Sequence, residues 1–112
     1  MVLKKELSHG DVEIEVRGNL IGSLVGEFRE ALNEEIGSPH TLIRLDLDKV
    51  RAINSSAIGS LLFFRKRAQE AGKTVRLVRC SPELRQTLLA IRFDKIMDMP
   101  GEEKPGTAGS GR

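Results

Sequence analysis

The sequence of 112 residues lacks tryptophan and tyrosine and has a single cysteine, Cys80. One cysteine excludes an internal disulfide and any zinc site built from cysteines. His9 and His40 are the only histidines, which is too few for a classical metal centre. The longest fully apolar runs, such as Leu61–Phe64, have four residues, whereas a membrane-spanning helix needs about 20. We therefore expect no metal, no cofactor and no membrane insertion.

Charge is divided unevenly along the chain, although the net charge is only +2. Residues 1–48 hold ten acidic and five basic residues, and residues 49–112 hold six acidic and thirteen basic residues. Such asymmetry can mark a nucleic acid or acidic partner surface. Four phenylalanines give few of the aromatic platforms that single-stranded nucleic acids need, so we expect solvated helix faces and no direct nucleic acid binding.

Residues 1–6 lack the apolar core of a signal peptide, which favours a cytoplasmic protein.

Apolar periodicity predicts alternating strands and helices, hence an α/β fold with a partly parallel sheet. Strands are predicted at 2–7, 12–16, 41–47 and 75–78, and a short strand or helix at 96–99. Helices are predicted from Leu24 to the Gly37–His40 segment that ends it, at about 55–71, and from Ser81-Pro82 onward, with Ser23 and Ser81 as caps and Gly72 as a stop. On the third helix, Leu84, Leu88 and Ile91 share one face. The Gly/Pro-rich residues 100–112 are predicted to be a disordered tail after one domain, 1–99.

The most informative stretch is 46–72, where an apolar strand leads through a polar turn into a helix opened by two serines. The first amides of a helix lack internal partners and carry the positive end of its dipole. A phosphate attached there is stabilised by both effects. Simple capping by Asn54 and Ser55 explains the same residues, so the pattern leaves both interpretations open.

Residues 46–99 resemble the STAS domain of bacterial anti-sigma factor antagonists. That family has a strand, then an Asp-Ser-Ser/Thr-Gly-Leu-Gly turn, then a helix ending near Lys/Arg-x-x-x-x-Gly. This chain reads NSSAIG at 54–59 and reaches Gly72 after Lys66 and Arg67. Further similar segments, at 16–18, 27–32, 75–78, 81–82 and 93–96, extend the resemblance over about residues 12–99. It implies a mixed sheet of four to five strands with three to four helices packed mainly on one face.

The resemblance also implies partner switching by a protein that is not an enzyme. In that family the antagonist binds a GHKL-type anti-sigma factor and serine kinase, phosphorylation releases it, and a PP2C-type phosphatase restores binding. By position the phosphate acceptor is Ser55, with Ser56 as the alternative. Asn54 replaces the family's Asp and Ala57 its Gly, so a non-phosphorylated STAS scaffold or transport-associated subunit is the alternative function. A small enzyme or nucleotide-binding domain is a third.

Helical geometry at about 100° per residue places Phe63 away from the apolar side of its helix. Ile58, Leu61, Leu62 and Ala68 cluster on the opposite side, with Phe64 at the edge of that cluster. An exposed phenylalanine beside the serine turn indicates a binding surface. The predicted partner-binding residues are Asn54, Ser55, Ser56, Ala57, Gly59, Ser60, Phe63 and Arg67.

The remaining polar candidates carry weaker signals. Cys80 precedes the Ser81-Pro82 helix start, where a dipole could lower its pKa, but a half-buried structural thiol is the preferred interpretation. Both histidines are expected to be exposed. Asp46 and Asp48 alternate along a strand end and are interpreted as solvated charges, since no complementary cluster supports a metal or acid–base site.

Overall fold

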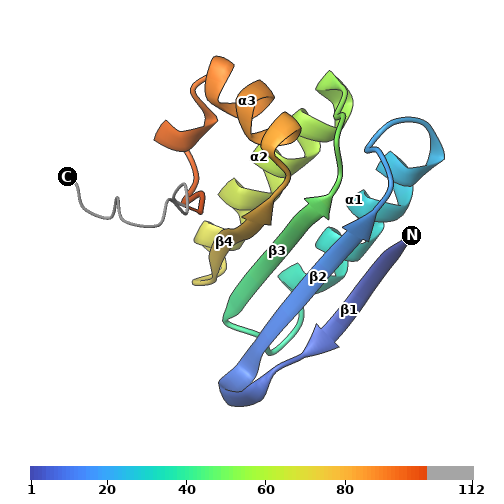
Figure 1. Ribbon diagram of the computed structural model, residues 1–112. Helices are drawn as coiled ribbons and strands as arrows, with labels where there is room; N and C mark the ends of the chain where they lie inside the picture. Colours follow the sequence, from blue (N-terminus) through green and yellow to red (C-terminus); the bar gives the residue numbers. More distant parts are fainter. Residues whose placement is uncertain (101–112) are drawn as a thin grey trace.

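Residues 1–100 are described by the computed structural model, and within them strands and helices alternate as the sequence predicts (Figure 1). The strands are β1 (Val2–Glu6), β2 (Asp11–Arg17), β3 (Leu42–Lys49) and β4 (Thr74–Cys80). The helices are α1 (Ser23–Ile36), α2 (Ser55–Glu70) and α3 (Pro82–Ala90), with short 3-10 turns at Ser8–Gly10 and Phe93–Lys95. Apart from Pro100, the tail predicted at 100–112 lies outside the described residues.

The strands form one mixed sheet in the order β1-β2-β3-β4. β1 and β2 are antiparallel and joined by a tight connection in which His9 and Gly10 take positive φ angles of 64° and 78°. β2, β3 and β4 are parallel, with α1 and α2 as the crossovers that parallel strands require. Because α1 and α2 each follow one of the parallel strands through a short loop, these two loops lie at the same end of the sheet (Figure 1).

One face of the sheet carries the core. Ile14, Leu45 and Leu77 lie side by side in register and are fully buried. Against them pack apolar side chains from all three helices, including Phe28 of α1 and Phe64 of α2. Figure 1 shows α1 and α2 running side by side along this face, with α3 beyond the end of β4. Within residues 1–100, the helices therefore leave the other face of the sheet open.

Charged side chains project from the open face of the sheet and form ion pairs with one another. They alternate along β2 and β3 with the buried apolar residues, as a period of two requires. The pairs are Arg17–Glu15 at 3.1 Å, Arg44–Glu13 at 3.5 Å, Arg79–Asp46 at 3.5 Å and Arg76–Asp98 at 3.4 Å. The prediction that Asp46 is a solvated charge is wrong, because this residue is only 5% exposed and also accepts from the backbone amide of Asp48.

A buried carboxylate ties the end of α1 to the edge strand. Glu35 is 3% exposed, and its oxygens lie 2.8 Å from Lys4 Nζ, 2.7 Å from Ser38 Oγ and 2.8 Å from His40 Nδ1. Burial alone raises the pKa of Glu35, but hydrogen bonds from Lys4, Ser38 and His40 outweigh it and hold that pKa at about 2. His40 Nε2 lies 2.8 Å from a carboxylate oxygen of Glu6. Hydrogen bonds with Glu35, which has the larger effect, and with Glu6 raise the pKa of His40. His40 is therefore a half-buried link, and the prediction that it is exposed is wrong.

The ends of two helices differ from the predictions. Ser23 is the first residue of α1 and does not cap it; Gly22 occupies the cap position with a positive φ of 59°. Ile91 is 47% exposed and does not share the buried face of Leu88. α3 ends at Ala90, so Ile91 is its C-cap residue, and the left-handed Arg92 follows it.

Segment 96–99 forms neither of the two elements predicted for it. It follows the 3-10 turn Phe93–Lys95 and makes an isolated bridge between Asp98 and Arg76 of β4. Phe93 and Met97 point into the core, so side-chain packing, rather than regular backbone hydrogen bonding, fixes this segment.

The predictions for Ser81 and Gly72 are confirmed: Ser81 Oγ accepts from Leu84 N at 3.2 Å, and Gly72 takes a positive φ just after α2.

Candidate partner-binding site

The serine turn is fixed by the loop that opens α1. Asn19 Oδ1 accepts hydrogen bonds at 3.1 Å from the backbone amides of Arg51 and Ala52. The backbone of Leu20 completes the attachment, since its amide donates to Ala52 and its carbonyl accepts from Asn54. The residues between β3 and α2 are thus held at both ends before the helix begins.

Asn54 caps α2, as the capping interpretation of the serine turn predicts. Its Oδ1 accepts from the Ala57 amide at 2.9 Å and satisfies one of the free donors of the first turn. Ser55 and Ser56 follow as the first two helical residues, and both are exposed. Ala57 is fully buried in the core, so the expectation that this side chain contacts a partner is wrong. Ala57 is the third residue of α2 and already faces the sheet. Its place in the sequence, next to two serines, does not indicate this.

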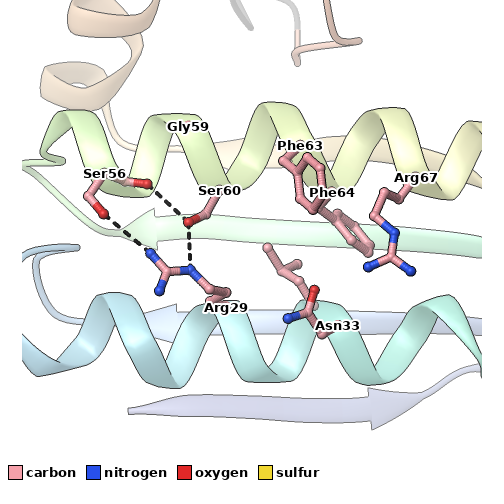
Figure 2. Close-up of a pocket in the computed structure, with 9 residues that line it drawn as sticks. Arg29, Asn33, Ser56, Gly59, Ser60, Phe63, Phe64 and Arg67 are labelled. Carbon is pink, nitrogen blue, oxygen red and sulfur yellow. Dashed lines mark hydrogen bonds between the residues drawn. The ribbon is translucent and has the colours of Figure 1, made fainter.

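A groove of about 340 Å³ runs between α1 and α2 (Figure 2). From α2 it is lined by Ser56, Gly59, Ser60, Phe63, Phe64 and Arg67, and from α1 by Arg29, Leu32 and Asn33. Arg29 bridges the helices: its Nε donates to Ser60 Oγ at 3.0 Å and its Nη2 to Ser56 Oγ at 3.3 Å. Ser60 Oγ in turn donates to the Ser56 carbonyl at 3.0 Å.

Two adjacent phenylalanines have opposite environments. Phe64 is 2% exposed and belongs to the core, whereas Phe63 is 59% exposed at the groove. The guanidinium carbon of Arg67 lies 5.8 Å from the centre of the Phe63 ring, within the range of a cation–π contact. The structure therefore places Phe63 among Ser56, Gly59, Ser60 and Arg67, the neighbours that helical geometry predicts.

Comparison with known proteins identifies the fold that presents this groove. Residues 3–107 match the STAS domain. The chain belongs to the STAS domain family. A STAS-domain-containing protein of Pseudomonas aeruginosa is 28% identical to it over 86 residues, which cover 77% of this chain and 84% of that protein.

Solved structures of anti-sigma factor antagonists share the fold of this STAS domain. The anti-sigma factor antagonist SpoIIAA in its unphosphorylated form superimposes with a TM-score of 0.75 at 19% identity, covering 92% of this chain and 90% of that one. The phosphorylated form of SpoIIAA, from Bacillus, gives 0.69 at 19% identity, covering 92% and 93%. An antagonist from Mycobacterium paratuberculosis gives 0.79 at 14% identity, covering 92% and 86%. The single mixed sheet with three helices is therefore an anti-sigma factor antagonist-like STAS fold.

The contribution of α1 to the groove is what sequence reasoning missed in this STAS domain. Arg29 and Asn33 are 27 and 23 positions from Ser56, and no motif connects them. A weak signal does exist in α1, which has glutamates at 27, 30, 34 and 35 but none three or four residues from Arg29. Because side chains three or four residues apart meet on a helix, Arg29 has no carboxylate partner within α1.

The other residues considered for chemistry, such as Cys80, do not line the groove. Cys80 is half-buried in β4, and burial raises the pKa of its thiol to about 11, so its position before α3 does not lower that pKa. In residues 1–100, no group of three or more histidine, cysteine, aspartate or glutamate side chains is arranged to hold a metal ion. Within the same range, no helix is long and apolar enough to cross a membrane.

Proposed function

We propose that this STAS domain is a non-enzymatic partner-switching regulator whose affinity for its partner is controlled at Ser55. The partner is a GHKL-type anti-sigma factor with serine kinase activity. Phosphorylation of Ser55 releases the domain from it, and a PP2C-type phosphatase reverses the modification. The fold shared with anti-sigma factor antagonists supports this proposal, and one of them is described in a phosphorylated form.

The observation that carries the proposal is the exposed serine at the start of α2. Ser55 is the first helical residue, where free backbone amides and the helix dipole favour an attached anion. The first turn contains no acidic residue, so a phosphate of charge near −2 meets no like charge there. Asn54 keeps the cap that an aspartate would supply while leaving the turn neutral. The turn can therefore carry a phosphate without losing its structure.

The contacts of Ser56 support Ser55 as the acceptor. Arg29 donates to Ser56 Oγ, so a positive charge lies against the oxygen that would have to attack ATP. A hydrogen bond to a guanidinium withdraws electron density from that lone pair and weakens it as a nucleophile. Ser55 lies one helical position away and faces solvent.

The test is phosphate transfer by the cognate kinase. The kinase is isolated by its binding to the full chain and incubated with the chain and ATP, and the product is examined by intact mass and by fragment mapping. We expect one phosphoryl group, lost in Ser55→Ala and retained in Ser56→Ala. Ser55→Asp should bind the kinase more weakly than the unmodified chain, although a carboxylate carries less charge than a phosphate. A kinase that binds the chain but transfers no phosphate would refute control at Ser55.

A STAS scaffold or transport-associated binding subunit is the second candidate. Two observations favour it: Asn54 stands where the antagonist family has aspartate, and Ala57 where it has glycine. The same experiment separates the two functions, since a scaffold binds its partner stably and is not modified. A neighbouring kinase or phosphatase gene would favour switching, and a transporter operon would favour the scaffold.

A further inference from the structure

The groove between α1 and α2 holds two guanidinium groups and no carboxylate. Arg29 enters it from α1 and Arg67 from α2, and the other side chains that line it are uncharged. Arg29 donates to two serine hydroxyls, and Arg67 lies over the Phe63 ring. Neither arginine forms a salt bridge within residues 1–100. Both charges are therefore free to meet an anionic group.

The open face of the sheet provides an internal comparison. It carries four arginines, twice as many as the groove, but each lies between 3.1 and 3.5 Å from a carboxylate of this chain. A carboxylate that already lies beside an arginine offsets its positive charge and repels a second carboxylate. Anionic partners are thus favoured at the groove and disfavoured at the sheet, despite the larger number of basic residues there.

The groove also offers an apolar surface between its charged ends. Figure 2 shows Arg29 near the Ser56 end, with Phe63 and Arg67 toward the other end. Phe63 is 59% exposed, and the buried Leu32 and Phe64 close the groove beneath it. An exposed aromatic next to an arginine is the composition typical of interface anchors. The volume of about 340 Å³ is at the small end of ligand sites, enough for a few side chains.

We infer that this groove binds an acidic segment of the partner protein, which places an apolar side chain against Phe63 and carboxylates on Arg29 and Arg67. Carboxylates make paired, charge-assisted hydrogen bonds with the guanidinium fork. The inference rests on the proposed function in one respect only, which is that the acidic segment belongs to the kinase. The chemistry of the groove does not depend on phosphorylation, so each can fail alone.

Gly59 provides a way to close the groove without disturbing the fold. It lies on α2 between Ser56 and Phe63, and a Cβ atom built on it meets nothing within 4 Å. A longer side chain at this position therefore enters the open space of the groove. Gly59→Met should fill the groove and, because methionine favours helices over glycine, should not lower the melting temperature.

The test uses amide NMR spectra of the full chain titrated with short peptides. The probe is an amidated hexapeptide with glutamates on both sides of a central leucine; the controls replace its glutamates with lysines or its leucine with serine. We expect saturable shifts confined to α1 and α2 with the probe, weakened as NaCl rises from about 50 to about 300 mM. We expect affinity to fall about tenfold or more in Gly59→Met and in the double variant Arg29→Gln, Arg67→Gln. The double variant Arg65→Gln, Lys66→Gln removes the same charge from α2 outside the groove and should bind as the unmodified chain does.

Several results would overturn the inference. Equal binding of the lysine peptide would remove the role of the two arginines, and equal binding of the serine peptide would remove the apolar anchor. Shifts that persist in Gly59→Met would place the site elsewhere. No shift at about 5 mM probe would show that the groove is not an acidic-peptide site. None of these results bears on phosphate transfer to Ser55, which is measured separately.

Discussion

Replacing Glu35 with glutamine should destabilise the domain by an amount that depends on pH. The carboxylate is almost fully buried, and Lys4, Ser38 and His40 contact it. Glutamine has nearly the same shape and can keep a hydrogen bond to Ser38, but it loses the charge that faces Lys4 and His40. The variant therefore isolates the electrostatic part of the link between α1 and β1.

The magnitude follows from the pKa of Glu35. Its value is about 2 in the folded chain, against an ordinary value of 4.5. At about 1.4 kcal/mol for each pKa unit, this difference corresponds to about 3 kcal/mol of stability at neutral pH. Because the folded-state pKa is the lower one, this stability is present above pH 4.5 and is lost as the pH falls toward 2. By pH 3, about 2 kcal/mol of it should be gone.

The assay is urea unfolding followed by circular dichroism between pH 3 and 7, on the unmodified chain and on Glu35→Gln. We expect the two free energies of unfolding to differ by about 3 kcal/mol at pH 6 and by about 1 kcal/mol at pH 3. Glu34→Gln is the matched control: this neighbour also contacts Lys4 at 2.8 Å, but its side chain is 68% exposed. Its loss should cost less than about 1 kcal/mol. A Glu35→Gln difference that does not change with pH would refute the electrostatic account and leave only packing.

Two further predictions concern α2. Phe63→Ala should weaken binding of the kinase by more than about 1 kcal/mol and leave the melting temperature nearly unchanged, whereas Phe64→Ala should destabilise the domain by about 3–5 kcal/mol. Calorimetry of binding and of unfolding measures both, and a large loss of stability in Phe63→Ala with normal binding would assign that ring to the core. Asn54→Ala should lower the free energy of unfolding by about 1 kcal/mol through loss of the cap, and Asn54→Asp should restore it. If the alanine variant were as stable as the parent, the hydrogen bond to Ala57 would contribute nothing.

The sequence predicted the elements well because each is encoded locally. Alternation of Val12, Ile14 and Val16 with charged residues is enough to define a strand with one buried face, and the structure buries these three. Ser81 caps α3 through its own side chain, and Pro82 and Gly72 mark helix ends by their backbone preferences, so these predictions also held. The errors at Ser23 and Ile91 both lie at helix ends, where the flanking residues Gly22 and Arg92 take positive φ angles.

The α2 side of the groove was predictable for the same reason. Ser56, Gly59, Ser60, Phe63 and Arg67 lie on one helix, so their common face follows from the helical repeat alone. Ala57 shows the limit of that reasoning, because a small residue gives little indication of which face it occupies. Only its packed position shows that it belongs to the core.

By itself, the sequence determined the order of strands and helices, the cap at Asn54 and the outward position of Phe63, all of which depend on residues a few positions apart. The tertiary structure alone decided which charges meet. Arg29 reaches Ser56 and Ser60 because α1 packs beside α2, and His40 bridges Glu35 and Glu6 because β1 closes against the end of α1. These contacts join residues up to 34 positions apart. No local preference encodes such pairs, since they form only when burial of the common core brings the elements together.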